Sequence, residues 1–299
     1  SRFGKFYLSA SGMIIRAVAR DVYKSRFGSR IGSKRGEIKE YTPRSRRRFM
    51  ERVFSVDWRK IPKERIFFVR LSYHSIPKDG REVKRHLDNF RKAMDEYFGD
   101  YGFVWKMEFQ QRGAVHFHLI LIINSVPKEW GNIEVGSTIF LVRLRSFVDK
   151  VWNRVTGEDE LHLRYGCRVE RARSKNGVIS YTLAYAGKFG EGKEYQHKVP
   201  EGTVGWGRFW GIVHREVFAV EWETIKVPEE VFHMARRVMM GYFRSRGRKF
   251  RVFHRYSGLW LIVADARAFL DRLDGYLWDR YIYHRGAHIN RTRGNGGTL

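Results

Sequence analysis

The chain has 299 residues, of which 43% are hydrophobic and 15% aromatic, so it can fold around one large core or two small ones. Its formal charge of +26 indicates a polyanionic partner, for which nucleic acid is the first candidate and an anionic membrane surface the second. The single cysteine, Cys167, excludes an intrachain disulfide and a thiolate zinc cluster, and with no secretory signal and no apolar run of membrane-spanning length it predicts a cytoplasmic protein.

Residues 1–60 contain many more Lys and Arg than Asp and Glu, and their apolar side chains follow a consistent period only between residues 13 and 23. This composition predicts a basic N-terminal extension that is loosely ordered without DNA. Its densest run supplies four candidate DNA-binding residues, Arg44, Arg46, Arg47 and Arg48.

Residues 61–215 alternate between strand-like and helix-like patterns. Apolar spacing predicts, in chain order, a strand at 65–73, a helix at 79–98, a hairpin at 103–123, a helix at 144–155 and a strand at 161–171. The order strand-helix-strand-strand-helix-strand predicts an α+β sandwich with an antiparallel sheet.

The hairpin is the most informative stretch. Its odd-numbered residues form an apolar face, and polar side chains occupy the even-numbered positions. A three-residue loop at 111–113 keeps even residues opposite even residues, so Glu108 should face His116 and Lys106 should face His118. Two imidazoles and one carboxylate on a rigid surface suit a divalent cation, although the same residues can also form a polar strand face without a metal.

A helix is predicted at residues 178–188. At about 100° per residue, its apolar stripe lies opposite a second stripe that carries two tyrosines and a lysine. The apolar stripe consists of Ile179, Leu183 and Ala186, and the opposite one of Tyr181, Tyr185 and Lys188. Two tyrosines one turn apart are ordinarily core residues, but their place away from the apolar stripe, next to a lysine, favours a functional role.

Residues 216–299 predict a second α+β unit. It should contain strands at 217–227 and 250–263, helices at 228–246 and 264–281, and a mobile, basic tail from residue 284. Arg244 and Arg246 add candidate DNA contacts, although a charge run is often only a solvated face. The near P-loop that ends at Glu194 lacks the Ser or Thr that holds Mg²⁺ and follows a helix, so no ATPase or helicase is expected.

His116-Phe117-His118, with Glu108 on the neighbouring strand, resembles the metal motif of the HUH superfamily of single-strand DNA nickases. Within it, the chain looks most like the rolling-circle replication initiators, or Rep proteins, of phages and plasmids. Three further stretches share the likeness: 67–73 resemble the first-strand motif, from which Arg70 and Ser72 depart, 181–188 the nucleophile motif, and 207–211 (GRFWG) a later motif. The resemblance implies the HUH endonuclease fold, a central antiparallel sheet with helices on both faces in an RRM-like or ferredoxin-like palm.

The resemblance also implies an activity. A tyrosine would attack a scissile phosphate in single-stranded origin DNA, leaving a 5′-phosphotyrosyl bond and a free 3′-hydroxyl, and could later rejoin the strands. The implied cofactor is Mn²⁺ or Mg²⁺ held by Glu108, His116 and His118. The implied partners are origin hairpin DNA and a helicase of a prokaryotic host.

Residue roles follow the motif. Tyr185-x-x-Lys188 matches the family's Tyr-x-x-Lys, so Tyr185 is the expected nucleophile and Lys188 its cationic partner. Tyr181 matches the first of two tyrosines in phage enzymes, but Ala184 stands where that pattern has Lys, which leaves its role open. Arg208 is a further candidate DNA contact. A relaxase or transposase of the same superfamily and a non-catalytic basic nucleic-acid-binding protein remain the alternatives.

Overall fold

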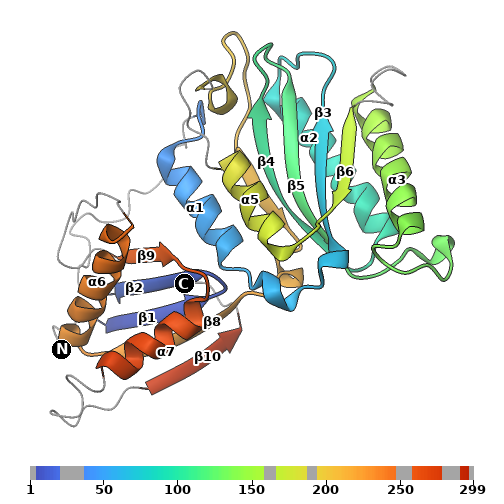
Figure 1. Cartoon of the computed structure of the whole chain (residues 1–299). Coiled ribbons are helices and arrows are strands. Elements are labelled where there is room, and N and C mark those ends of the chain that lie inside the picture. The colour runs from blue at the N-terminus through green and yellow to red at the C-terminus, as the bar shows by residue number, and fades with distance from the viewer. Residues whose placement is uncertain are drawn as a thin grey trace. The chain divides into compact units, whose positions relative to one another are not determined.

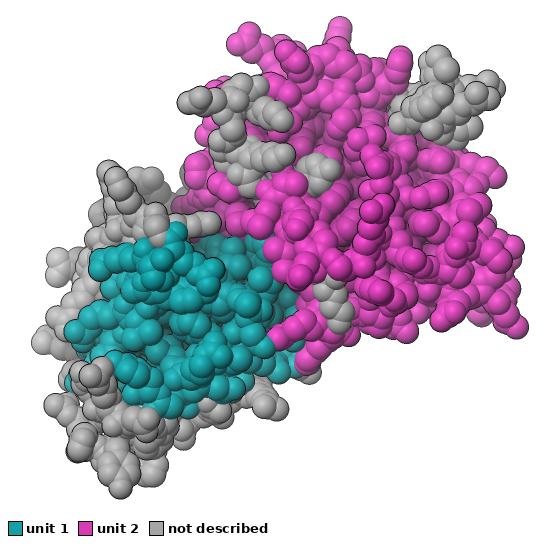
Figure 2. Space-filling view, in the orientation of Figure 1, with its two compact units in different colours: residues 1–33, 54–57, 219–299 teal, residues 34–53, 58–218 magenta. Residues whose placement is uncertain are grey.

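A computed structural model of the chain describes residues 5–20, 37–157, 166–186, 194–246, 258–277 and 290–295. Its contacts divide the chain into two compact units, coloured separately in Figure 2. Unit 1 comprises residues 1–33, 54–57 and 219–299, and unit 2 comprises 34–53 and 58–218. Each unit contains a five-stranded antiparallel sheet with helices (Figure 1), which confirms the predicted α+β class.

The sheet of unit 2 has the strand order β6-β3-β5-β4-β7. The strands are β3 (Ile66–Ser72), β4 (Tyr101–Phe109), β5 (Val115–Ile123), β6 (Cys167–Arg171) and β7 (Trp210–Val213). Helix α2 (Gly80–Tyr97) lies in sequence between β3 and β4, and α3 (Thr138–Thr156) between β5 and β6. The predicted order strand-helix-strand-strand-helix-strand is therefore confirmed.

Helices cover both faces of this sheet. On the odd-numbered face, Phe90 of α2 meets Phe103 with ring centroids 6.4 Å apart, and Trp152 of α3 meets Phe117 at 6.0 Å. The even-numbered face carries α1 (Pro43–Phe54) and α5 (Lys175–Ala186). Phe49 of α1 packs on Trp210 of β7 at 5.5 Å. The polar face of the hairpin is therefore an interior surface.

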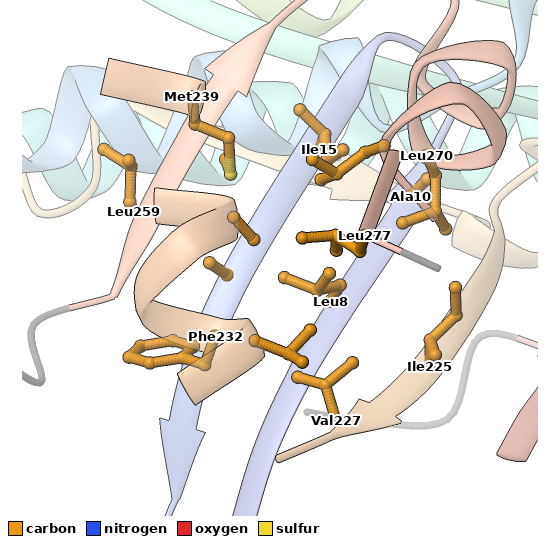
Figure 3. Packing of buried hydrophobic residues seen from close by; sticks show 14 of the residues in the cluster. Leu8, Ala10, Ile15, Ile225, Val227, Phe232, Met239, Leu259, Leu270 and Leu277 are labelled. Carbon is orange, nitrogen blue, oxygen red and sulfur yellow. The ribbon is translucent and has the colours of Figure 1, made fainter. Parts of the chain in front are cut away.

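Unit 1 is built on the strand order β10-β8-β1-β2-β9. The strands are β1 (Lys5–Ser11), β2 (Ile14–Arg20), β8 (Glu221–Val227), β9 (Leu259–Ile262) and β10 (Asn290–Asn295). Helices α6 (Glu229–Arg244) and α7 (Ala266–Leu277) pack on one face over Leu8, Ile15 and Ile225, as Figure 3 shows. Short 3-10 turns lie elsewhere at Trp58–Lys60, Lys63–Arg65, Lys128–Trp130, Glu194–His197 and Arg215–Val217.

The prediction of a loosely ordered extension over residues 1–60 is wrong for two stretches. Residues 5–20 form the antiparallel pair β1 and β2 inside the unit 1 sheet, because Phe6, Leu8 and Ala10 alternate with polar residues and bury one face. Residues 43–54 form α1. The turn at Gly12 is held by segment 54–57, since a side chain at this positive φ would meet the Val56 carbonyl oxygen at 2.5 Å.

Several other predicted bounds change. Strand 217–227 is shortened to β8, and 290–295 of the expected mobile tail pair with β8 as β10. Three expected stretches (161–165, 250–257 and 278–281) lie outside the described residues. The other expected helices correspond to α2, α3, α6 and α7. Among helices within the described ranges, none has the length and apolar character to cross a membrane.

Candidate active site

The hairpin of β4 and β5 has the predicted register. Glu108 pairs with His116 and Lys106 with His118. The loop closes through Gln110, whose backbone N–H donates to the Ala114 carbonyl at 2.7 Å, and Gly113 takes a positive φ of 90° there. The three predicted ligands therefore lie on one face of two neighbouring strands.

A buried ionic network occupies the centre of this face. Lys106 is 1% exposed, Glu108 7% and His118 6%. Lys106 Nζ contacts Glu108 Oε1, and His118 Nε2 donates to Glu108 Oε2 at 3.2 Å. Burial opposes ionisation of Glu108, but the His118 hydrogen bond and the Lys106 charge outweigh it and lower its pKa to about 2. Glu108 is therefore ionised at neutral pH.

His116 has a different partner. Its Nε2 contacts the amide nitrogen of Gln110, and Gln110 Oε1 accepts from Arg112 Nε at 2.8 Å. Arg112 is fixed in turn, because its Nη2 donates to the Tyr73 carbonyl at 2.8 Å. Since the Gln110 nitrogen is the donor, His116 Nε2 presents a lone pair. An open hollow lined by Gln110, Gln111 and Arg112 lies at this end of the hairpin.

The structure brings together only two of the three predicted ligands. Glu108 and His118 are in contact, while the His116 and His118 rings are 6.1 Å apart and nearly perpendicular. Among the residues that the structure describes, no group of three His, Cys, Asp or Glu is close enough to hold a metal ion. The reason is local, because Gln110 engages His116 and Lys106 engages Glu108.

The donor chemistry nevertheless fits a divalent cation. Burial, followed by the charges of His118 and Arg70, lowers the pKa of His116 to about 4, and burial also lowers that of His118. Two neutral imidazoles and an ionised carboxylate are the protonation states that metal ligation requires. The 3.2 Å between His118 Nε2 and Glu108 Oε2 also suits a shared ion, since two atoms about 2.1 Å from one ion at a right angle are about 3 Å apart.

Helix α5 places Tyr181 against this network. The Tyr181 ring stacks on Phe68 of β3 with centroids 4.2 Å apart, and its hydroxyl lies 3.5 Å from His118 Nδ1. His118 thus has Glu108 at one ring nitrogen and Tyr181 at the other. Tyr185 lies one turn later in α5, but its side chain and all of Lys188 lie outside the described residues.

The predicted core stripe of α5 is wrong. Leu183 is 44% exposed, whereas Val178 and Thr182 are buried on the side that also carries Tyr181. The cause lies in the surface below the helix. Phe68 and His118 offer an aromatic and polar contact there, so the tyrosine side of the helix, not its leucine, packs inward.

Arg70 is a site residue that the sequence did not single out. It pairs with His118 across β3 and β5, so it lies on the same face. Its Nε is buried and has no hydrogen-bond partner among the described residues. The signal was present in the sequence, because Arg70 has the even parity of the site and departs from the family's first-strand pattern. An arginine here suits an anionic ligand.

The GRFWG stretch supplies edge strand β7. Trp210 pairs with Lys106, and its Nε1 donates to Ser45 Oγ of α1 at 3.0 Å. Gly211 is required beside it, since a Cβ there would lie 2.6 Å from the Trp105 indole nitrogen. This motif therefore helps to hold α1 over the network.

The predicted DNA-binding arginines divide into three groups. On α1, Arg44, Arg47 and Arg48 are exposed, whereas the charge of Arg46 reaches inward and helps to lower the pKa of Lys106. Arg208 is exposed just before β7. Arg244 and Arg246 are exposed near the end of α6 in unit 1, where Arg246 lies 4.9 Å from the Tyr242 ring centre. A DNA contact of each remains a prediction.

Residues 66–190 match a family model of phage replication-associated proteins, those of the ORF2 and gene 2 protein type. This segment of the chain belongs to that family. The matched segment runs from β3 through α5 and contains Glu108, His116, His118 and both tyrosines. The resemblance to phage-type replication initiators is thereby confirmed over this segment. No curated protein and no solved structure matches the chain.

Proposed function

We propose that this chain is a replication initiator that nicks and rejoins single-stranded DNA at a phage or plasmid origin. The observation that carries the proposal is the contact of Glu108 and Tyr181 with the two ring nitrogens of His118, inside the segment that matches the replication-associated family. The strand order β6-β3-β5-β4, with α2 and α3 as its crossovers, supports the HUH endonuclease fold with an RRM-like palm. Origin hairpin DNA is the proposed substrate and a host helicase the proposed partner.

Glu108, His118 and His116 would hold the cofactor, Mn²⁺ or Mg²⁺. His116 already presents a lone pair at Nε2, which it would exchange from Gln110 to the ion. The ion would polarise the scissile phosphate and offset the negative charge that develops on it. Arg70 lies beside the same two histidines and would bind a phosphate oxygen through its guanidinium.

Tyr185 is the proposed nucleophile. Its phenol oxygen forms a bond to the scissile phosphorus, the bond to the 3′-oxygen breaks, and the phenol proton is balanced by the proton that the 3′-hydroxyl gains. One phosphodiester is exchanged for another, so the reverse step rejoins the strands. Lys188, one turn further along the chain, would stabilise the tyrosinate or the phosphate.

Tyr181 has a positioning role in this proposal. When His118 binds a metal through Nε2, its proton resides on Nδ1, and a ligand histidine is ordinarily oriented by a partner at that second nitrogen. The Tyr181 hydroxyl is 3.5 Å from Nδ1 and its ring is held by Phe68. Tyr181 therefore orients His118, while Tyr185 performs the attack.

The test is cleavage of a fluorescent hairpin oligonucleotide with Mn²⁺ or Mg²⁺. We expect cleavage and a covalent protein-DNA adduct with the unaltered chain, and neither with His118→Ala or Glu108→Ala, while DNA binding persists. Tyr97→Phe on α2, at a tyrosine that is 41% exposed, is the matched control and should cleave normally. Binding without cleavage in the unaltered chain, across metals and origin sequences, would favour a non-catalytic nucleic-acid-binding protein instead.

A further inference from the structure

The unit 1 sheet has a second face, opposite α6 and α7. Both described helices of this unit pack over Leu8, Ile15, Ile225 and their neighbours. Successive strand residues point to opposite faces, so the residues between these core positions lie on the second face. Register fixes their order across the sheet, because Trp260 pairs with Arg16, Arg16 with Ser9, and Ser9 with Thr224.

This second face combines aromatic and cationic side chains. Its aromatic residues are Tyr7, Trp222 and Trp260, and its cations are Lys5, Arg16, Arg20 and Lys226. The three rings are partly exposed, and Lys5 and Lys226 are exposed. In β1, β2, β8 and β9 this face carries no Asp or Glu. The acids of β8 occupy the helix-covered face, where Glu221 pairs with Arg267 at 3.1 Å and Glu223 is buried.

The rings and cations are already stacked on one another. The Arg16 guanidinium lies 3.4 Å from the Trp222 ring centre, and that of Arg20 lies 5.2 Å from the Tyr7 ring centre. Between them, Ser9 is buried and shares a hydrogen bond of 3.1 Å with Thr224. A guanidinium held flat on an indole offers its other side to a further planar group, and its N–H groups remain charged donors.

We propose that this second face binds single-stranded DNA, with bases stacked on Trp260 and on the Arg16–Trp222 pair, and with Arg20 and Lys226 neutralising phosphates. Unpaired bases stack on aromatic rings and guanidinium planes, whereas paired bases cannot reach a flat sheet. The strands from β8 to β9 span about 14 Å, enough for a few nucleotides. The identity of the strand as DNA rests on the proposed function, but the face lies outside the matched residues 66–190.

The alternative occupant, an anionic membrane surface, fits less well. A membrane-binding face needs contiguous apolar side chains that can enter the lipid. Here Ser9, Thr224 and the cations separate the rings, and two of the three rings lie against arginines. The chemistry is that of a stacking surface for a polyanion.

The test is the binding of fluorescent oligo-dT to the full chain, followed by anisotropy. Trp260→Ala should weaken binding by about 5- to 150-fold, the usual effect of losing one base-stacking ring. Arg20→Gln with Lys226→Gln should reduce the slope of log K against log salt by about 1.4, at about 0.7 per phosphate contact. Tyr276→Ala and Arg272→Gln change exposed residues of α7 in the same unit and should bind as the unaltered chain does.

Two readouts keep the proposal open to refutation. Near-ultraviolet circular dichroism reports whether Trp260→Ala keeps its fold, and if it does not, Lys226→Gln at an exposed position carries the test. Photocrosslinking of bromodeoxyuridine oligonucleotide should map to peptides that contain Trp260, Trp222 or Tyr7. Unchanged affinity and salt slope in the folded variants, or binding to anionic vesicles but not DNA through these residues, would overturn the proposal.

These results are independent of cleavage. If the unaltered chain binds oligo-dT through this face but forms no adduct with any origin hairpin, the proposed nicking function fails and the stacking face stands. If adducts form normally at saturating DNA and the variants bind as tightly as the unaltered chain, the stacking face fails and the nicking function stands.

Discussion

Replacing Glu108 with Gln removes the only acid in the buried network while keeping its shape. In the unaltered chain the pKa of Glu108 falls from 4.5 to about 2. Each tenfold change in proton affinity is worth about 1.4 kcal/mol, so the ionised carboxylate stabilises the fold by roughly 3 kcal/mol. Gln at 108 also leaves Lys106 buried without its counter-ion, a change that typically costs about 3–5 kcal/mol. We therefore expect a loss of roughly 3 kcal/mol at pH 7.

Urea unfolding in EDTA, followed by circular dichroism, measures this loss. Because the folded pKa of Glu108 is depressed, its stabilisation is present above the unfolded value of 4.5 and is lost as pH falls toward about 2. The difference between the unaltered chain and Glu108→Gln should shrink over that window. Adding Lys106→Met to Glu108→Gln should restore more than half of the lost stability, because no buried charge is then left unpaired. A cost below about 1 kcal/mol at pH 7, unaffected by Lys106→Met, would refute the ionic network.

Three further predictions concern the site and its substrate. Arg70→Gln should slow adduct formation on the order of a hundredfold, the usual effect of losing one charge-stabilising donor, and an unchanged single-turnover rate would remove Arg70 from the phosphate site. Gln110→Ala should tighten Mn²⁺ binding by about two- to tenfold in calorimetry, because the amide no longer competes for His116 Nε2, and weaker binding would instead make Gln110 a ligand. Affinity for single-stranded DNA should fall with salt at about −0.7 in log K per phosphate contact, and a slope near zero would contradict an electrostatic interface.

The hairpin register was predictable because it rests on local rules. Strand parity and an odd loop length decide that Glu108 faces His116, and the structure agrees. The choice of side-chain partners was not predictable in the same way. It depends on burial by α1 and α5, which bring Tyr41 within 4.9 Å of Lys106 and Tyr181 within 3.5 Å of His118. These contacts join parts of the chain that no local pattern connects.

The N-terminal strands were missed for a related reason. Phe6, Leu8 and Ala10 alternate as a strand requires, but the high charge of the surrounding sixty residues was given more weight. The strands that confirm β1 and β2 are distant in sequence, and Ser9 and Thr224 are 215 positions apart. The orientation of α5 was missed because helical periodicity assumes an apolar partner, whereas Tyr181 packs on Phe68 beside polar groups.

The central claim is that a tyrosine of α5 attacks DNA at the site formed by Glu108 and His118. The most direct measurement is peptide mapping of the covalent adduct from a fluorescent origin hairpin, comparing the unaltered chain with Tyr185→Phe and Tyr181→Phe. We expect the adduct on the peptide that contains Tyr185, its loss in Tyr185→Phe, and a reduced amount in Tyr181→Phe. An adduct that persists in Tyr185→Phe and disappears in Tyr181→Phe would exchange the two roles, and one that persists in the double variant would contradict the tyrosine mechanism.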